Sequence, residues 1–410
     1  MTALGYYDYP DDLRRSSHQH GLWWSQRRGA LLAGRRRTPV LTYFLYHGLS
    51  SMRIAISTGG GDAPGLNAVI RAAVLSAISC GWEVLGIKKG FAGLMGEDQV
   101  IPLTRETVRG IAHLGGTILR TTNRGNPFSY PRKQADGSFI PEDRSDELIE
   151  NARQLGIDAI ISIGGDGSLE IAKRLCDKGM HIVGVPKTID NDVSGTVTTF
   201  GFDTAVNTAL EAIDKLHTTA ESHDRVMVME VMGRDAGFIA LHSGVAGTAD
   251  VVLIPEIPYD LGKVCEKIAA RDAAGRHFSI VVVAEGAYPR GGHSHTMGES
   301  MPGEARRIGG VADSIAREIQ MVTGKETRSL VLGHLQRGGM PTSYDRLLAT
   351  RFGGAAVRAI ADGKWGYMVA LQTPHIVTIP IEEALRETKR VDITHDLVKT
   401  ARATGISFGD

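Results

Sequence analysis

The sequence contains little cysteine, with Cys80, Cys176 and Cys265 as the only three in 410 residues. They lie far apart, and no two of them have the spacing of a metal-binding pair. A disulfide framework and a cysteine-based zinc site are therefore not expected. We interpret the three residues as reduced thiols in or near the core of a cytoplasmic protein.

The chain also lacks net charge and long apolar runs. Because 46 Lys and Arg balance 46 Asp and Glu, we expect neither nucleic acid nor an anionic membrane surface as a partner. No apolar run approaches the ~20 residues that a membrane-spanning helix needs. With 42% apolar and 22% charged residues, the composition is typical of a globular protein, and the length suffices for two domains.

The first 51 residues differ from the rest of the sequence. They contain Trp23 and Trp24, a run of three arginines from Arg35, and little hydrophobic periodicity. Arginine-rich leaders can be targeting segments, but the acidic residues near the start do not fit a transit peptide. Because Met52 directly precedes a predicted strand, we expect residues 1–51 to be a disordered or non-native N-terminal extension.

Glycine, by contrast, is abundant, and many of the 50 glycines follow predicted strands. A buried-strand pattern over residues 53–58 leads into residues 59–65, Gly-Gly-Gly-Asp-Ala-Pro-Gly, and then into a predicted helix over 66–79. Free backbone N–H groups at a helix start can bind anions. The residues after Gly65 exclude a Walker loop, and Pro64 excludes a dinucleotide fingerprint. An anion site and a tight turn with nothing bound both remain possible.

Two further strand ends carry acidic residues. The predicted strand 158–163 leads into Gly164-Gly165-Asp166-Gly167-Ser168, where Asp166 is placed to bind Mg²⁺ that bridges phosphate groups. The predicted strand 181–185 leads into residues 186–192, Pro-Lys-Thr-Ile-Asp-Asn-Asp. Asp190 and Asp192 are candidates for a general base or for metal ligands, and the alternative is that they form helix caps and turns.

The alternation of strands and helices predicts an α/β protein. We expect two three-layer αβα domains with mostly parallel sheets and an active site in the interdomain cleft. A helix is expected near residues 104–114, and the loop after it contains Arg120 and Arg124. The predicted first domain comprises residues 52–201 plus 336–386, and the second comprises residues 202–335 plus 387–410.

Five motifs together resemble those of the 6-phosphofructokinase family, over essentially residues 52–410. They occur in the family's order, at residues 60–65, 164–167, 188–192, 232–234 (Met-Gly-Arg) and 333–339 (Gly-His-Leu-Gln-Arg-Gly-Gly). The resemblance implies a glycolytic kinase that phosphorylates fructose 6-phosphate with ATP and Mg²⁺. It also implies a homo-oligomer, either a dimer or a tetramer, with the nucleotide in the first domain and the sugar phosphate in the second.

The resemblance further implies roles for individual residues. Asp190 would be the catalytic base that takes the proton of the sugar 1-hydroxyl, and Asp166 would bind Mg²⁺. The nucleotide would be bound by Gly61, Arg124, Gly164, Gly165, Asp166, Gly167 and Ser168, with Arg124 one residue beyond the family's usual arginine position at Asn123. The sugar phosphate would be bound by Thr188, Asp190, Asp192, Arg225, Met232, Gly233, Arg234, Glu285, Arg328, His334 and Arg337. Of these, Arg225 and Arg328 would reach in from a neighbouring subunit.

Two positions bear on the phosphoryl donor. In this family, glycine after the metal-binding aspartate accompanies ATP, whereas aspartate there and a lysine before Thr188 accompany pyrophosphate. This chain combines Gly167 with Lys187, the pattern of the mixed-substrate group III. We predict ATP, because Gly167 leaves room for the α-phosphate. The alternative is a diphosphate-dependent fructose 6-phosphate 1-phosphotransferase.

Two other classes of protein share part of this pattern. Lipid and NAD kinases also use a Gly-Gly-Asp-Gly element, but they would not explain the arginines and His334 of the second domain. A catalytically silent sensor would have no need for acidic residues close to bound phosphates, where they are costly. The effector-site residues of allosteric bacterial enzymes are only partly matched, by Arg71 and Arg105 among others, so allosteric control is left open.

Overall fold

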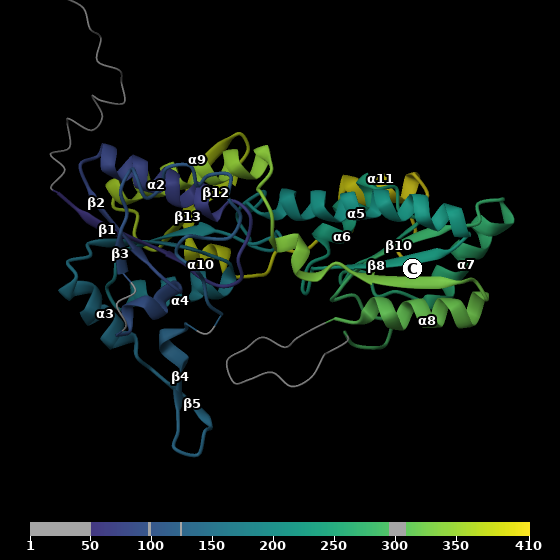
Figure 1. Cartoon of the computed structure of the whole chain (residues 1–410), viewed down its shortest axis with the longest axis horizontal. Helices are drawn as coiled ribbons and strands as arrows, with labels where there is room; N and C mark the ends of the chain where they lie inside the picture. Colours follow the sequence, from purple (N-terminus) through teal and green to yellow (C-terminus); the bar gives the residue numbers. More distant parts are fainter. Residues whose placement is uncertain (1–50, 97–99, 124, 295–308) are drawn as a thin grey trace, which may run out of the picture. The chain divides into compact units, whose positions relative to one another are not determined.

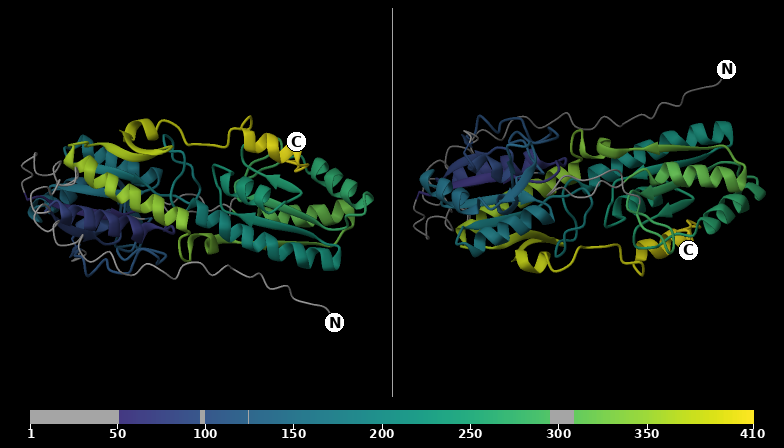
Figure 2. Two further views of the ribbon diagram at one scale, coloured as in Figure 1. Left: turned by 90° about the horizontal axis from the view of Figure 1, so that it is seen from above. Right: turned by 90° about the horizontal axis from the view of Figure 1, so that it is seen from below.

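The computed structural model describes residues 51–96, 100–123, 125–294 and 309–410. Residues 51–410 form one compact unit that contains two sheets with helices on both faces (Figures 1 and 2). The predicted α/β class is confirmed. The predicted extension lies outside the described residues, apart from Ser51. The predicted boundaries between a first and a second domain stay a prediction.

Seven strands form the larger sheet, in the order β13-β12-β7-β6-β1-β2-β3. The pairings from β12 through β7, β6 and β1 to β2 are parallel, and both edge strands are antiparallel to their neighbours. The strands are β1 (Arg53–Thr58), β2 (Glu83–Ile87), β3 (Val100–Pro102), β6 (Ala159–Gly164), β7 (Ile182–Pro186), β12 (Tyr367–Gln372) and β13 (His375–Pro380).

Helices cover both faces of the larger sheet (Figure 1). One face carries α2 (Leu66–Ser79) and α9 (Ser343–Ala361), and the other carries α3 (Ser145–Gln154), α4 (Asp166–Asp177) and α10 (Ile381–Ala384). Every residue of β6 and β7 is buried as a result. Burial on both faces explains why these two strands appear in the sequence as continuous apolar runs.

The second sheet has four parallel strands in the order β11-β8-β10-β9. Side chains of β8 alternate between two apolar cores, with Val226 and Val228 in one and Met229 and Val231 in the other, as the strand period requires. The strands are β8 (Val226–Val231), β9 (Val251–Leu253), β10 (Ser279–Ala284) and β11 (Thr327–Val331). The covering helices are α5 (Phe202–His223), α6 (Phe238–Ala246), α7 (Leu261–Ala273), α8 (Val311–Thr323) and α11 (Asp396–Ala403).

The helix predicted near residues 104–114 does not form, because the chain makes turns there. The backbone N–H of Thr104 donates to the Thr107 side chain at 2.8 Å, and that of Thr107 donates to the Thr104 side chain at 3.3 Å. This pair resembles a helix cap, but Gly110 adopts a φ of 73°, which a right-handed helix does not allow.

The remaining elements are short. They are η1 (Gly90–Leu94), η2 (Pro127–Ser129), η3 (Gly333–Arg337) and the antiparallel pair β4 (Tyr130–Lys133) and β5 (Phe139–Glu142). Across the described part of the chain, no helix has the length and apolar character needed to cross a membrane.

Candidate active site

Three acidic or glycine-rich segments meet at one edge of the larger sheet. The parallel strands β1, β6 and β7 are direct neighbours, so their carboxyl ends lie side by side, where open α/β sheets bind ligands. The backbone N–H of Gly59 donates to Ile163 at 2.9 Å, and that of Lys187 donates to Gly164 at 2.9 Å. The tertiary structure therefore brings together the three segments that the sequence analysis selected.

Close packing explains two of the glycine positions without any ligand. A Cβ atom at Gly59 would lie 2.5 Å from the Ser168 hydroxyl, and one at Gly164 would lie 2.2 Å from the Ser168 Cβ. The Ser168 side chain thus fills the space between the ends of β1 and β6. Gly167 differs, because a Cβ atom there would meet no described residue within 4 Å. Among the described residues, the space beside Gly167 is open to a ligand.

Asp166 opens α4 at this edge. Its Oδ1 atom is buried and has no hydrogen-bond partner among the described residues. Burial raises the pKa of Asp166 to about 7, and the negative charges of Asp192 and Asp235 add to the effect. A buried carboxylate in this state is stabilised by a cation, so the site fits a divalent metal ion that also contacts phosphate oxygens.

Asp190 and Asp192 follow β7 in the same region. The backbone N–H of Asp190 donates to the Thr188 hydroxyl at 3.1 Å, which folds the segment into a tight turn. The Asp190 Oδ1 atom is buried without a hydrogen-bond partner in the described ranges. Burial and the charge of Asp192 raise the pKa of Asp190 to about 6, and burial also raises the pKa of Asp192. Asp190 is therefore a carboxylate that can accept a proton near neutral pH.

Lys187 brings an amine into the same site. The side chain is only 3% exposed, and its Nζ atom donates to the backbone oxygen of Gly61. Burial and the nearby Arg337 lower the pKa of Lys187 to about 8. The amine lies against the first glycine-rich segment, where a phosphate group would be held, so Lys187 is positioned to contact an anionic donor.

A segment after β11 completes this part of the site. The Nη1 atom of Arg337 donates to the backbone oxygen of Asp62 at 3.1 Å. The fully buried Gln336 accepts from the backbone N–H of Met232 at 3.4 Å and donates to Gly333 at 3.1 Å. These bonds connect η3 with the glycine-rich segment on one side and with the end of β8 on the other. Gln336 was not predicted as a site residue, because its role depends on contacts distant in sequence.

Further charged side chains lie within electrostatic range of Asp190. Burial raises the pKa of Glu285 to about 7, and the negative charges of Asp190 and Glu230 add to the effect. Arg234 lowers the pKa of Asp190 and pairs with Asp235 at 2.8 Å. Gly233 adopts a φ of 135° at this turn, a conformation that favours glycine. Glu285 and residues 232–234 therefore belong to the same site as the carboxylates after β7.

Arg225 and Arg328 do not join this site within the chain. They lie at or before the amino ends of β8 and β11, whereas residues 232–234 follow the carboxyl end of β8. A six-residue strand spans roughly 20 Å, so these arginines lie at the opposite edge of the sheet. Arg225 pairs there with Glu326 at 2.9 Å, and Arg328 pairs with the same carboxylate.

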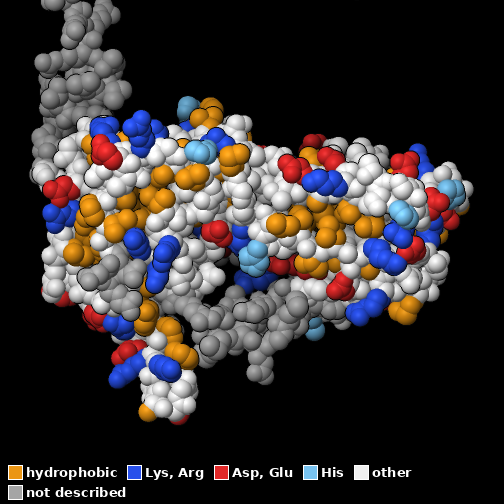
Figure 3. Space-filling model, viewed as in Figure 1, with side chains coloured by type: hydrophobic (Ala, Val, Ile, Leu, Met, Phe, Trp, Pro, Cys, Tyr) orange, Lys and Arg blue, Asp and Glu red, His pale blue; other side chains and the backbone are white. Residues whose placement is uncertain are grey.

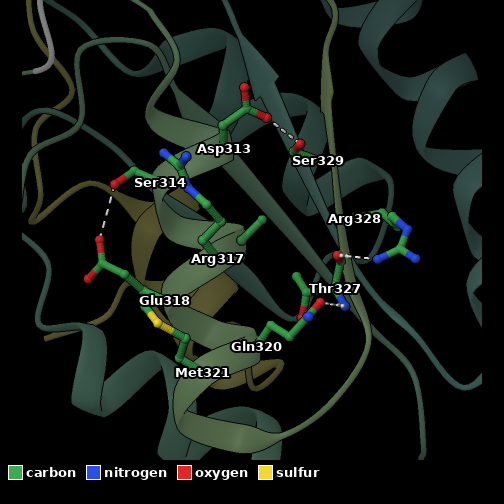
Figure 4. Close-up of a pocket in the computed structure, with 10 residues that line it drawn as sticks. Asp313, Ser314, Arg317, Glu318, Gln320, Met321, Thr327, Arg328 and Ser329 are labelled. Atoms are coloured by element: carbon green, nitrogen blue, oxygen red, sulfur yellow. Dashed lines mark hydrogen bonds between the residues drawn. The ribbon is translucent and has the colours of Figure 1, made fainter.

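Figure 4 shows Arg328 beside a groove between α8 and β11. The groove has a volume of about 530 Å³, and its lining includes Asp313, Arg317, Met321 and Ser329. The Arg328 guanidinium points away from the helix side of the groove (Figure 4). This arginine is therefore presented outward from the amino edge of its own sheet.

The two remaining predicted site residues are Arg124 and His334. Arg124 lies outside the described residues. His334 is exposed on η3. Within the described ranges, no group of three or more His, Cys, Asp and Glu side chains could hold a metal ion by itself. A cation at Asp166 would therefore need oxygen ligands from a bound substrate, which is common for Mg²⁺.

The sequence is similar to those of several known proteins. A family model described as phosphofructokinase matches residues 53–360. The ATP-dependent 6-phosphofructokinase of Chloroflexus aggregans is 54% identical over 358 residues, which cover 87% of this chain and 98% of that protein. The pyrophosphate–fructose 6-phosphate 1-phosphotransferase of Streptomyces coelicolor is 49% identical over 344 residues, which cover 83% and 96%.

A solved structure shows the same fold. The phosphofructokinase of Pichia pastoris in the T-state is similar with a TM-score of 0.70 and 30% sequence identity. The match covers 87% of this chain and 37% of that longer chain. Proteins whose names specify ATP and proteins whose names specify pyrophosphate are thus both similar to this sequence. The choice between the two phosphoryl donors therefore has to be argued from the geometry of the site.

Proposed function

Because the chain belongs to the phosphofructokinase family, we propose that it is an ATP-dependent 6-phosphofructokinase, which converts fructose 6-phosphate to fructose 1,6-bisphosphate in glycolysis. The observation that supports this most is a pair of buried carboxylate oxygens, one of Asp166 and one of Asp190, that have no hydrogen-bond partner among the described residues. They lie beside two glycine-rich strand ends. One carboxylate suits a metal-bound phosphate chain and the other suits a hydroxyl nucleophile. Together they fit phosphoryl transfer to an alcohol.

Asp190 is the proposed general base. It accepts the proton of the sugar 1-hydroxyl while the hydroxyl oxygen forms a bond to the terminal phosphorus of the donor. The bond from that phosphorus to the bridging oxygen breaks, and ADP leaves with the electron pair. A base with a pKa of about 6 is ionised at neutral pH and still basic enough to take a proton in the transition state.

Asp166 is the proposed protein ligand of Mg²⁺. A bound Mg²⁺ would supply positive charge that neutralises the charge developing on the donor phosphate groups. The chain's own contribution is to hold one buried carboxylate oxygen free for it. The backbone of residues 59–61 and 164–168 and the N-terminus of α4 would bind the phosphate groups of the nucleotide, with Arg124 as a further predicted contact.

The proposed sugar-phosphate site lies on the other side of Asp190. Cationic and hydrogen-bonding groups there suit a dianionic phosphate and several hydroxyls. The residues proposed for this role in the same chain are Thr188, Asp192, Met232, Gly233, Arg234, Glu285, His334 and Arg337.

Gly167 and Lys187 bear on the choice of donor. The open space beside Gly167 can accept the α-phosphate of ATP, which supports ATP. The Lys187 amine at Gly61 is compatible with pyrophosphate as well, and it supports the alternative function of a diphosphate-dependent phosphotransferase. We favour ATP, because a side chain in the α-phosphate space would exclude ATP and none is present.

The decisive experiment compares initial rates with fructose 6-phosphate and Mg²⁺, using ATP and pyrophosphate side by side. We expect rapid turnover with ATP and at least ~10-fold lower kcat/KM with pyrophosphate, a difference of about 1.4 kcal/mol in transition-state binding. A preference for pyrophosphate would assign the donor choice to Lys187. Turnover with neither donor would contradict the proposed activity.

Arg225 and Arg328 suggest that the active enzyme is a homo-oligomer. They lie at the edge of their sheet opposite the site of their own chain, so any part they take in catalysis would be in the site of a neighbouring subunit. Figure 3 also shows hydrophobic side chains exposed over the four-stranded sheet. Large exposed ones on α8, β11 and the following segment are Met321, Val322, Leu330, Val331, Leu335 and Met340. Exposed apolar side chains of this number are typical of a subunit interface.

Mixing two inactive variants tests this arrangement. In a symmetric dimer with shared sites, a chain with Asp190→Ser and a chain with Arg328→Ser form a heterodimer in which one of the two sites is intact. After dissociation and random reassembly, we expect about a quarter of wild-type activity to return. The control is the double variant Asp190→Ser, Arg328→Ser, which should restore nothing to either single variant. No recovery in reassembled mixtures would contradict a site that is shared between subunits.

A further inference from the structure

The connection between α10 and α11 passes beside both halves of the candidate site. It runs from residue 385 to residue 395, and Figure 2 shows it as the yellow trace that joins the helices of the two sheets. Two residues of this connection form hydrogen bonds to the two halves, Lys389 to one and Val391 to the other. Together with the residue between them, they form residues 389–391. We call these three residues the strap. The sequence analysis assigned residues 387–410 to the second domain and predicted no site residue among them.

Lys389 connects the strap to the segment that carries Asp190. Its backbone N–H donates to the backbone oxygen of Asp192 at 2.8 Å. Its Nζ atom donates to Asn191 Oδ1 at 3.1 Å and to the backbone oxygens of Thr196 at 3.1 Å and Val197 at 2.7 Å. One side chain therefore bonds the turn after β7 at its middle and at its far end.

Asn191 has an unusual backbone conformation that these bonds stabilise. It lies between the two acidic residues of the site, has a φ of 56° and is 5% exposed. Its Oδ1 atom accepts both from Lys389 and from the backbone N–H of Thr199, at 3.1 Å each. A left-handed residue without these bonds would relax toward the commoner right-handed or extended conformations. Such a change would alter the orientation of Asp190 and Asp192 relative to each other, because Asn191 links them.

The strap also bonds to the other half of the site. The backbone N–H of Val391 donates to Glu256 Oε1 at 2.8 Å. The same carboxylate accepts from the backbone N–H of Gly237 at 3.0 and 3.1 Å. Gly237 precedes α6, at the end of the loop that carries residues 232–234. The Lys389 ammonium also lies 5.2 Å from the ring centre of Phe238 in α6.

At position 389, a lysine stabilises the fold less than an apolar or amide side chain would. Its ammonium is mostly removed from water and donates to neutral oxygens, with no carboxylate in hydrogen-bond contact among the described residues. Burying a cation in this way costs free energy that an apolar or amide side chain would not cost. What the ammonium supplies is three donors aimed at one turn.

We propose that Lys389 is a positioning residue for phosphoryl transfer, which holds the turn at Asn191 and thereby places Asp190 and Asp192 against the loop of residues 232–237. Lys389 acts through the carboxylate segment and through the strap, and it does not contact the reacting atoms. The inference rests on the proposed role of Asp190 in catalysis. It adds a residue from the C-terminal connection to a site otherwise built from strand ends.

Steady-state kinetics of three variants tests the role. We expect Lys389→Met to lower kcat by roughly 10- to 100-fold, because small misplacements of catalytic groups cost up to about 100-fold. The KM for ATP should change by less than about twofold, because Lys389 forms no hydrogen bond with the nucleotide segments among the described residues. Lys389→Arg keeps the charge and several donors, so its kcat should be about tenfold higher than that of Lys389→Met. The exposed Lys399 of α11 offers the matched control Lys399→Met, which should match the wild type.

A second measurement separates positioning from a general loss of stability. In the double variant Lys389→Met, Asn191→Ala, kcat should be no lower than in the worse single variant, because both changes release the same turn. Each variant is compared by thermal unfolding, so that rates refer to folded enzyme. Additive losses in kcat would overturn the proposal, and so would an unchanged kcat in folded Lys389→Met. Asp190→Ser tests the base separately. Substantial turnover in that folded variant would overturn the proposed function, whereas an inactive Asp190→Ser together with wild-type kcat in Lys389→Met would overturn only the positioning role.

Discussion

Substitution of Asp190 by serine should abolish turnover, with a fall in kcat of about 10³-fold or more. Serine cannot accept the proton of the sugar 1-hydroxyl, and water at that position is a weaker and less well placed base. Fructose 6-phosphate should still bind with an affinity within a few-fold of the wild type, because its phosphate is proposed to be held by arginines and a histidine. Turnover is measured with saturating ATP, and sugar binding by calorimetry or fluorescence.

The control for this substitution is a carboxylate outside the site. Asp214 is exposed on α5, and Asp214→Asn should keep wild-type kcat and stability. Removal of the buried Asp190 charge should also raise the free energy of unfolding slightly, because burial and Asp192 disfavour its ionised form. Substantial turnover in folded Asp190→Ser would show that another group takes the proton, and Asp192 would be the next candidate.

Substitution of Gly167 by aspartate should cause the largest change in donor preference. The added carboxylate would enter the open space beside Gly167 and meet the α-phosphate of ATP with both bulk and negative charge. We expect kcat/KM for ATP to fall by about 100-fold or more, a loss of roughly 2.7 kcal/mol in transition-state binding. Activity with pyrophosphate should fall much less, because pyrophosphate has no third phosphate.

The protein itself should tolerate this change, which makes the result interpretable. A Cβ atom at Gly167 meets no described residue within 4 Å, and Gly167 has no positive φ, so neither packing nor backbone strain opposes a side chain. Gly167→Asn is the matched variant that adds similar volume without charge, and Gly164→Asn is a contrasting one that should destabilise the fold through Ser168. Unchanged kcat/KM for ATP in Gly167→Asp would place the nucleotide elsewhere.

Both predictions concern residues that the sequence motifs alone indicate as site residues. Short apolar runs that end in Gly-Gly-Asp-Gly or in Thr-Ile-Asp-Asn-Asp are local signals, because a buried strand and the polar turn after it are adjacent in the chain. Family membership and the α/β class followed from such motifs. The local signal gave a wrong prediction at residues 104–114. Hydrogen bonds typical of a helix cap form there, but no helix follows them.

The sequence by itself determined the α/β fold, the family and the strand ends that carry Asp166, Lys187 and Asp190, because these depend on the order of residues along the chain. Only the tertiary structure decided that Ser168 fills the space above two glycines. Only the tertiary structure placed Arg328 at the far edge of its sheet and brought Lys389 to the turn at Asn191. Lys389 and Asn191 are almost two hundred residues apart, and contacts at that separation depend on how the sheets and connections pack.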